Sequence, residues 1–226
     1  MRILVVTATD AEVAALVPSL VPAAGRTSRL RSYTHDRHAV DVLTTGVGMV
    51  ATAMWCSGVF ARERYDVVLN GGVCGSFRPA LPPGTVVHVT TDRIAELGAE
   101  DGDAFLSVQE LQLLGEDEFP WTCGRLVNSV PPRNGALDQL PVGDAITVNT
   151  VHGNEATIAR VVERYNPHVE SMEGAAFMYA CLVHGVPFAQ VRAVSNIVER
   201  RNRNAWKLRE AVDALGAALF AIIDRS

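Results

Sequence analysis

Residues 169–196, VESMEGAAFMYACLVHGVPFAQVRAVSN, decide the fold class of this chain. The stretch begins as a short apolar strand, continues as a helix over 173–185 and ends as a second buried strand over 187–196. Gly185 and Pro187 form a helix stop signal, because glycine is favoured just past a helix end and proline cannot continue a helix. A strand–helix–strand unit with apolar strands is typical of a mainly parallel sheet with helices on both faces.

The same alternation extends over most of the 226 residues. Apolar, β-branched runs predict strands over 2–9, 84–97 and 143–148, and a strand followed by a glycine-rich turn within 65–77. Alternation over 29–45 predicts a hairpin-like pair of strands. Helical spacing of apolar residues predicts helices over 10–20, 46–63, 153–165 and 205–225. Residues 97–142 predict loops, with one strand within 124–130. No linker divides the chain, so we expect one domain over residues 1–226.

Composition argues against several classes of protein. A formal net charge of −5 argues against nucleic acid as the main partner. No apolar stretch approaches the roughly 20 residues needed to cross a bilayer, and the first ten residues do not resemble a secretion signal. The four cysteines are widely spaced, and no histidine pair has ligand spacing. We therefore expect a cytoplasmic protein with reduced thiols and no metal.

Polar groups follow the predicted strands, where α/β proteins bind their ligands. Glu12 follows the first strand, a glycine-rich turn lies at 71–75, Glu173 begins the helix of the opening stretch, and Asn196 ends its last strand. These groups suit a small polar ligand with hydroxyls and ring nitrogens. The phosphate-binding loop, the dinucleotide fingerprint and the G-x-S-x-G elbow are all missing, so we expect no cofactor.

Each of these side chains also has a purely structural explanation. Glu173 could be a helix N-terminal carboxylate stabilised by the helix dipole. Glu12 could be an ordinary acid in a first helical turn, and Asn196 could simply end a strand and start a turn. The residue types alone leave these alternatives open. His152 and Glu170 are expected to be structural or to support the residues that contact the ligand, and not to be catalytic.

Taken together, the segments resemble the purine nucleoside phosphorylase and methylthioadenosine nucleosidase superfamily, in the same order along the chain. RILVVTATDAEVAAL, TTGVGMVATAM, NGGVCGSF and GDAITV are similar to motifs of its nucleosidases, and VESMEGAAF and VPFAQVRAVSN are the most specific matches. Asn196, where the nucleosidases have aspartate, and the following IVERRNRNAW resemble the futalosine hydrolase branch. The resemblance implies an α/β, single-domain, three-layer α/β/α sandwich with a twisted, mixed central sheet. It also implies a homodimer or larger homo-oligomer.

The resemblance further implies hydrolysis of a nucleoside at its N-glycosidic bond. In this branch, futalosine is cleaved to hypoxanthine and dehypoxanthine futalosine in menaquinone biosynthesis. Carried over by position, Glu12 activates the attacking water, Glu173 holds the ribose hydroxyls, and Asn196 donates to the departing purine. The other implied substrate contacts are Met172 beneath the ribose, the backbone at Val73 and Gly75 along the pocket, and Ile146 and Thr147 beside the purine.

The amide at position 196 bears on which purine is cleaved. A 6-oxo purine offers acceptors at N7 and O6, so an amide suits it better than a carboxylate does. The acidic segment VVTATDAEV favours water over phosphate as the nucleophile. Two other interpretations remain, namely an adenine-releasing nucleosidase that acts on methylthioadenosine, S-adenosylhomocysteine or aminodeoxyfutalosine, and a nucleoside-binding protein without catalysis. Candidates for pairing with the carboxylate of the futalosine tail are Arg93, Arg201 and Arg203.

Overall fold

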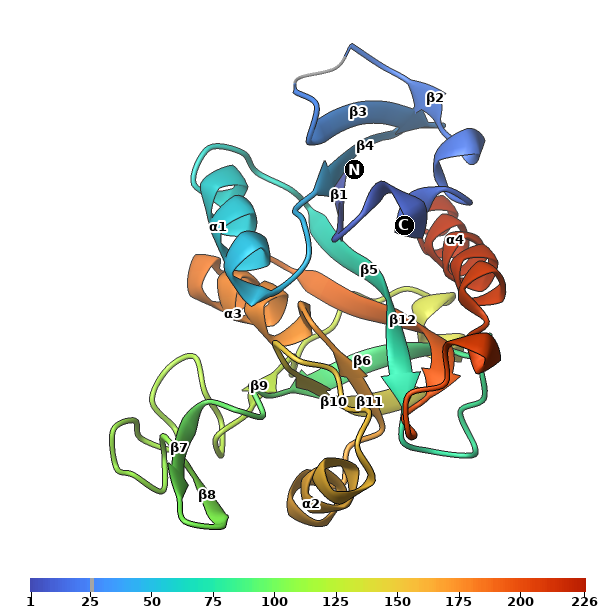
Figure 1. Ribbon diagram of the computed structural model, residues 1–226. Coiled ribbons are helices and arrows are strands. Elements are labelled where there is room, and N and C mark those ends of the chain that lie inside the picture. Colours follow the sequence, from blue (N-terminus) through green and yellow to red (C-terminus); the bar gives the residue numbers. More distant parts are fainter. Residues whose placement is uncertain (25–26) are drawn as a thin grey trace.

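The computed structural model describes residues 1–24 and 27–226, which form one large sheet with helices on both sides (Figure 1). The strands are β1 (Arg2–Thr7), β2 (Val21–Pro22), β3 (Leu30–His35), β4 (His38–Thr44), β5 (Val67–Ser76), β6 (Val86–Asp92), β7 (Gly98–Asp101), β8 (Ala104–Ser107), β9 (Leu126–Val127), β10 (Val142–Thr147), β11 (Val169–Ser171) and β12 (Phe188–Ile197). The α-helices are α1 (Met49–Phe60), α2 (Glu155–Tyr165), α3 (Gly174–His184) and α4 (Leu208–Asp224). Short 3-10 turns are η1 (Asp10–Val13), η2 (Val17–Ser19), η3 (Leu137–Gln139) and η4 (Arg203–Ala205).

The central sheet is mixed and partly closed on itself. Its strand order is β11-β10-β6-β12-β5-β1-β4-β3-β2, and β11 also pairs with β5. The pairs of β1 with β4 and β5, of β5 with β12, and of β10 with β6 and β11 are parallel. The pairs β6–β12, β5–β11 and β3–β4 are antiparallel. The predicted mixed sheet is therefore confirmed, and β5, β12, β6, β10 and β11 form a ring.

Two apolar cores flank the sheet, because successive side chains of a strand point to opposite faces. On one face, Val5 of β1 packs in a cluster with Leu215 of α4. On the other face, Val6 packs in a second cluster with Phe60 of α1 and Phe177 of α3. Figure 1 shows α1 and α3 on one side of β5 and β12, with α4 on the other side. The predicted three-layer α/β/α arrangement is confirmed.

Helix starts differ from the predicted ones for identifiable reasons. The segment 10–20 forms η1 and η2 instead of one helix, and Pro18, which has no backbone N–H to continue a helix, lies within η2. The helix predicted from residue 46 begins only at Met49, since Gly46 and Gly48 adopt φ angles of 93° and 96°, outside the helical region. Helix α3 ends at Gly185 as predicted, with a φ of 62°.

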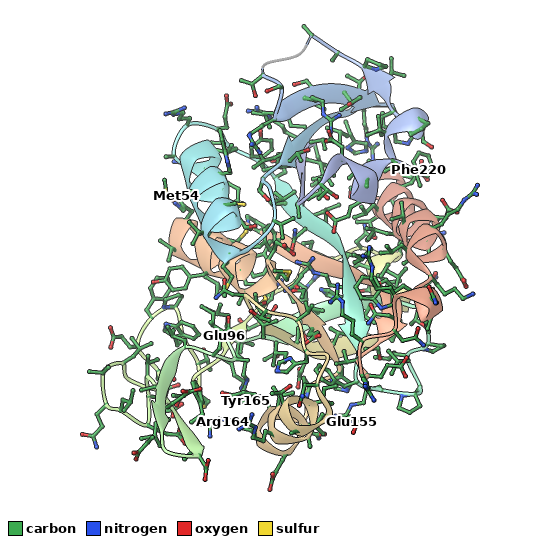
Figure 2. The ribbon with its side chains drawn as sticks, viewed as in Figure 1. Met54, Glu96, Glu155, Arg164, Tyr165 and Phe220 are labelled. Atoms are coloured by element: carbon green, nitrogen blue, oxygen red, sulfur yellow. The ribbon has the colours of Figure 1, made fainter. Side chains whose placement is uncertain are left out.

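Residues 97–142 contain more structure than the sequence predicts. β7 and β8 pair as a separate two-stranded antiparallel sheet beside α2, and only the short β9 lies in the predicted strand segment 124–130. The guanidinium of Arg164 in α2 stacks over the Phe105 ring of β8 at 5.2 Å. Figure 2 shows Arg164 and the adjacent Tyr165 between α2 and this hairpin. In the described part of the chain, no helix has the length and apolar character that a membrane crossing requires.

Candidate active site

The site is built around the glycine-rich end of β5. At this end β5 lies between β12 and β11, and Gly75 is the register partner of both Asn196 in β12 and Glu170 in β11. A Cβ atom on Gly75 would lie 3.4 Å from Asn196 Nδ2, 3.5 Å from Glu170 Cγ and 2.8 Å from Val198 Cγ2. The missing side chain therefore leaves the space into which the flanking polar groups project.

Glu12 is a buried carboxylate held in one orientation by its own segment. Its Oε2 atom accepts hydrogen bonds from the Thr7 hydroxyl (2.9 Å) and from the backbone N–H groups of Ala8 (3.0 Å) and Thr9 (2.9 Å). Its Oε1 atom accepts one from the backbone N–H of Val73 in β5, at 3.2 Å. Donors to an ionised carboxylate are strong and directional. One oxygen is thus used for anchoring, whereas the other keeps a lone pair for a ligand.

Glu173 is the second buried carboxylate of the site. Its Oε1 atom accepts the backbone N–H of Gly48 at 3.0 Å, and its Oε2 atom lies 3.7 Å from Nη1 of Arg192. Burial raises the pKa of Glu173, and the nearby Glu12 charge adds to this, whereas Arg192 and the Gly48 N–H lower it. Glu173 and Glu12 are therefore close enough to interact electrostatically. A carboxylate in this setting can accept hydrogen bonds from two adjacent hydroxyls.

Arg192 lies next to both carboxylates and is itself fully buried. A Cβ atom on Gly72 would lie 2.2 Å from Nη1 of Arg192 and 3.1 Å from Oε1 of Glu12, so the guanidinium and the carboxylate meet above this glycine. The guanidinium also donates from Nε to Gln190 (3.1 Å) and from Nη2 to Asn70. The arginine is thus fixed by neutral partners, and its charge is directed at the two glutamates.

A chain of buried hydrogen bonds continues from Arg192 to the start of α3. Gln190 Nε2 donates to Asp92 Oδ2 at 3.1 Å, and the Thr147 hydroxyl donates to Asp92 Oδ1 at 3.0 Å. The Thr147 oxygen in turn accepts the Ala175 N–H at 2.7 Å. Burial raises the pKa of Asp92 to about 6, against the opposing effect of the Gln190 and Thr147 hydrogen bonds. The network joins β6, β10, β12 and α3 beneath the two glutamates.

Asn196 is aimed by an irregularity in β12. The register with β5 shifts between Val194 and Asn196, which places Ser195 in a β-bulge. The Asn196 Oδ1 atom lies 2.8 Å from the Ser195 hydroxyl, and Nδ2 donates to the Ile197 carbonyl at 3.0 Å. An amide nitrogen has two hydrogens. One N–H of Asn196 is therefore left for a ligand above Gly75.

The other predicted contact residues are placed less uniformly. Val73 and Met172 are half-buried, and each is adjacent to the site, Val73 through its N–H to Glu12 and Met172 as the neighbour of Glu173. Gly75 is central. Ile146 is buried in a cluster with Val148 and with Val161 of α2, whereas Thr147 directs its hydroxyl to Asp92. The side chains of Ile146 and Thr147 therefore contact the interior of the protein.

A small pocket of about 50 Å³ opens beside Asn196. The Arg201 guanidinium stacks over the Trp206 ring at 5.4 Å, and both residues line this pocket. Of the three candidate arginines, Arg201 alone lines this pocket. The residues that line it include Gly75, His152, Glu170, Asn196, Arg201 and Trp206.

Several residues of the site are not predicted from the sequence. Arg192, Gln190, Asn70 and Asp92 have one detectable signal, because each is a polar residue within or at the end of an apolar strand, where polar groups need partners. His152 and Glu170 line the pocket, although their sequence context predicts a structural or supporting role.

A group of possible metal ligands lies outside this site. Within the residues that the structure describes, the three side chains spaced to share an ion are His35, Asp36 and Asp224, which lie near the β3–β4 turn and the end of α4. The candidate site offers Glu12, Glu173 and Asn196 instead, and each of them is already engaged with protein donors or acceptors. Its chemistry is that of two carboxylates, an arginine and an amide.

Comparison with known proteins shows the family of the chain. The sequence model of the phosphorylase superfamily matches residues 2–225. A futalosine hydrolase from Streptomyces coelicolor is 36% identical over 185 residues, covering 79% of this chain and 76% of that protein. A futalosine hydrolase from Thermus thermophilus is 31% identical over 188 residues, 80% of each chain.

Solved structures show the same fold at lower identity. A methylthioadenosine/S-adenosylhomocysteine nucleosidase from Colwellia psychrerythraea, in complex with adenine, superposes with a TM-score of 0.80 at 20% identity, over 100% of this chain and 95% of the other. The native futalosine hydrolase of Helicobacter pylori superposes with a TM-score of 0.81 at 14% identity, over 100% and 98% of the two chains. The chain therefore belongs to the phosphorylase superfamily and, within it, to the futalosine hydrolase family.

Proposed function

We propose that this protein is a nucleosidase that hydrolyses futalosine to hypoxanthine and dehypoxanthine futalosine, a step of menaquinone biosynthesis. The observation on which this mainly depends is the grouping of Glu12, Glu173 and Arg192 above Gly72, with Asn196 one step along β5 at Gly75. Identity above 30% to two futalosine hydrolases supports the choice of substrate. The substrate is a small nucleoside and the nucleophile is water.

Glu12 acts as the general base in this proposal. Breaking an N-glycosidic bond gives a sugar with oxocarbenium character, which a water molecule then attacks. The Oε1 atom of Glu12 orients this water and takes its proton, while Oε2 stays bound to Thr7, Ala8 and Thr9. Because the carboxylate is already fixed, little reorganisation accompanies the proton transfer.

Glu173 holds the ribose. Its carboxylate accepts hydrogen bonds from the 2′- and 3′-hydroxyls, and its negative charge stabilises the positive charge that develops on the sugar. The Gly48 N–H and Arg192 keep the side chain in place. Met172, next in the chain, packs against the ribose.

Asn196 stabilises the departing purine. With its oxygen beside the Ser195 hydroxyl, the amide presents its nitrogen to the ligand. An N–H of Asn196 donates to N7 or O6 of hypoxanthine, which spreads the negative charge of the leaving group. The backbone at Val73 and Gly75 forms the floor of the pocket, and the strand end at Ile146 and Thr147 supports the purine side from behind.

The geometry favours water over phosphate as the nucleophile. Phosphate binding needs free N–H donors near the reacting carbon. Here the N–H groups of Ala8, Thr9 and Val73 donate to the Glu12 carboxylate. A phosphate at this position would displace a buried carboxylate and would meet its negative charge.

The decisive experiment is incubation with futalosine and with aminodeoxyfutalosine in phosphate-free buffer, with the released base identified by chromatography. We expect hypoxanthine from futalosine at a rate that added phosphate does not change. Asn196→Asp should shift preference toward the 6-amino purine. Faster release of adenine by the unmodified protein would support the nucleosidase alternative, and purine binding without turnover would support a binding protein. Dependence on phosphate would contradict the proposal.

We also propose that two copies associate through α1 and α3. These helices pack against each other and leave an apolar surface, formed by Val47, Val50, Met54, Trp55, Tyr179 and Val183, which are exposed in one chain. Val50 and Met54 are 79% and 71% exposed, and Figure 2 shows Met54 on the outer side of α1. Exposed apolar side chains gathered on two packed helices are typical of an interface.

The four cysteines are free thiols, which favours a cytoplasmic location.

A further inference from the structure

We propose that the His152–Glu170 pair selects 6-oxo purines by accepting the N1–H of the base. This inference depends on the proposed function, because it concerns the purine end of the same substrate. It assigns a specificity-determining role to His152 and a positioning role to Glu170. Asn196 and this pair would then contact adjacent edges of one purine ring.

The His152–Glu170 pair lies beside Asn196 at the end of β5. Gly75 has Asn196 as its register partner on one side and Glu170 on the other, so the two side chains flank the same point of β5. The distances of 3.4 Å and 3.5 Å from the position of a Gly75 Cβ show that both reach the same space. His152, Glu170 and Asn196 also line one pocket. A base placed over Gly75 with one edge at Asn196 has the pair at another edge.

Glu170 determines which nitrogen of the His152 imidazole carries the ring proton. Glu170 is buried and accepts two hydrogen bonds from His152, one from the backbone N–H to Oε1 at 3.1 Å and one from ring Nδ1 to Oε2 at 2.6 Å. A carboxylate at Nδ1 places the ring proton there, and the lone pair of a neutral imidazole is then on Nε2. Within the described part of the chain, His152 Nε2 has no hydrogen-bond partner. It is therefore available to a ligand as an acceptor.

Hypoxanthine and adenine differ in the hydrogen-bonding group at N1. In hypoxanthine N1 bears a hydrogen and can donate, whereas in adenine N1 has a lone pair and can only accept. An acceptor at His152 Nε2 pairs with the first base and faces a lone pair of the second. A site built to hydrogen-bond one group discriminates strongly against an analogue that lacks it, because a buried polar group is then unpaired.

The sharpest test is Glu170→Gln. The His152 N–H continues to require an acceptor, so the glutamine oxygen takes the place of Oε1 and its NH₂ faces Nδ1. The imidazole then carries its proton on Nε2 and becomes a donor toward the base. We expect the ratio of kcat/KM for futalosine over aminodeoxyfutalosine, which differ at C6 and N1 of the purine, to fall by about tenfold or more. A merely structural role would lower both values together.

Two further variants complete the experiment. His152→Ala should reduce the same ratio by weakening futalosine binding without improving aminodeoxyfutalosine. Glu163→Gln, an equivalent change on the exposed surface of α2, should leave the ratio unchanged. Folding of each variant is checked by its melting temperature. An unchanged ratio in both Glu170→Gln and His152→Ala overturns this inference while hypoxanthine release by the unmodified protein continues. Failure of that release instead overturns the proposed function.

Discussion

At the scale of single residues, the charged side chains of the site are held in one orientation by hydrogen bonds to the protein before a ligand binds. Glu12 is held by donors from Thr7, Ala8, Thr9 and Val73. Arg192 is held by Gln190 and Asn70. Preorganised charges of this kind stabilise a transition state more effectively than mobile ones.

The role of Glu12 can be tested by Glu12→Gln. The amide can keep the hydrogen bonds to one oxygen but cannot take a proton from water. We expect kcat for futalosine to fall by about 10²- to 10⁴-fold, which is the usual contribution of a general base. KM should change much less. A variant with kcat close to the unmodified value would contradict the assignment.

Asp92 gives a prediction for stability against pH. Burial raises its pKa from an ordinary value of 3.8 to about 6, so the folded protein holds this proton more tightly than the unfolded chain does. The resulting stabilisation is complete below the unfolded value and is lost as the pH rises through about 6. The loss is on the order of 3 kcal/mol in the free energy of unfolding.

The measurement compares the unmodified protein with Asp92→Asn, which cannot ionise there. Urea denaturation at pH 4, 5, 6 and 7 gives the free energy of unfolding of each. We expect the unmodified protein to lose stability relative to Asp92→Asn as the pH rises over this range. Parallel curves would show that Asp92 does not titrate in this interval.

The sequence predicts the catalytic candidates better than it predicts their partners. The three predicted side chains stand at strand or helix ends, where their types suggest a ligand site. They are Glu12, Glu173 and Asn196, and the structure brings them to the C-terminal half of β5. Arg192 and Gln190 are two positions apart in an apolar strand and so share a face, but no local rule indicates which carboxylates they meet. Those carboxylates are Glu12 in η1, Asp92 in β6 and Glu173 at the start of α3, and the sheet order brings them together.

At the scale of elements, Thr147 joins β10, β6 and α3. Its hydroxyl donates to Asp92 and accepts the N–H of Ala175 in the first turn of α3. Thr147→Val preserves the shape but leaves both groups without this partner. We expect a loss of about 2–3 kcal/mol in the free energy of unfolding, measured by urea denaturation. Thr150→Val, at an exposed position, is the control and should have little effect.

Elements with strong apolar periodicity are the ones that the sequence predicts well. The strands β1 and β6 and the helices α1–α4 lie within their predicted segments, and β12 extends one residue beyond its segment. The glycine-rich turn predicted at 71–75 is wrong, because β5 continues as a strand to Ser76. The hairpin β7–β8 is missed because its first strand is exposed over all of Gly98–Asp101, so no apolar pattern marks it. The bulge at Ser195 is missed for a different reason, since a bulge depends on the pairing of two strands.

At the scale of the whole molecule, the apolar surface of α1 and α3 predicts self-association. Met54→Glu places a charge in the middle of this surface without affecting the core, because Met54 is exposed. We expect the unmodified protein to elute as a dimer or larger species and the variant to shift toward the monomer, measured by size-exclusion chromatography with light scattering. Asp213→Lys, a charge change on α4, should leave the mass unchanged. A monomeric unmodified protein would contradict the proposed interface.

The position of β5 in the sheet has a consequence for amide hydrogen exchange. Its first half lies between β1 and β12, and its last residues lie between β11 and β12. Backbone N–H groups in these two parts can exchange with solvent only when the sheet itself opens, and they should be among the last to take up deuterium. A segment as rich in glycine as NGGVCGS would be among the most flexible in an unfolded chain. Here it should be among the most rigid, which gives the substrate a floor that does not move during turnover.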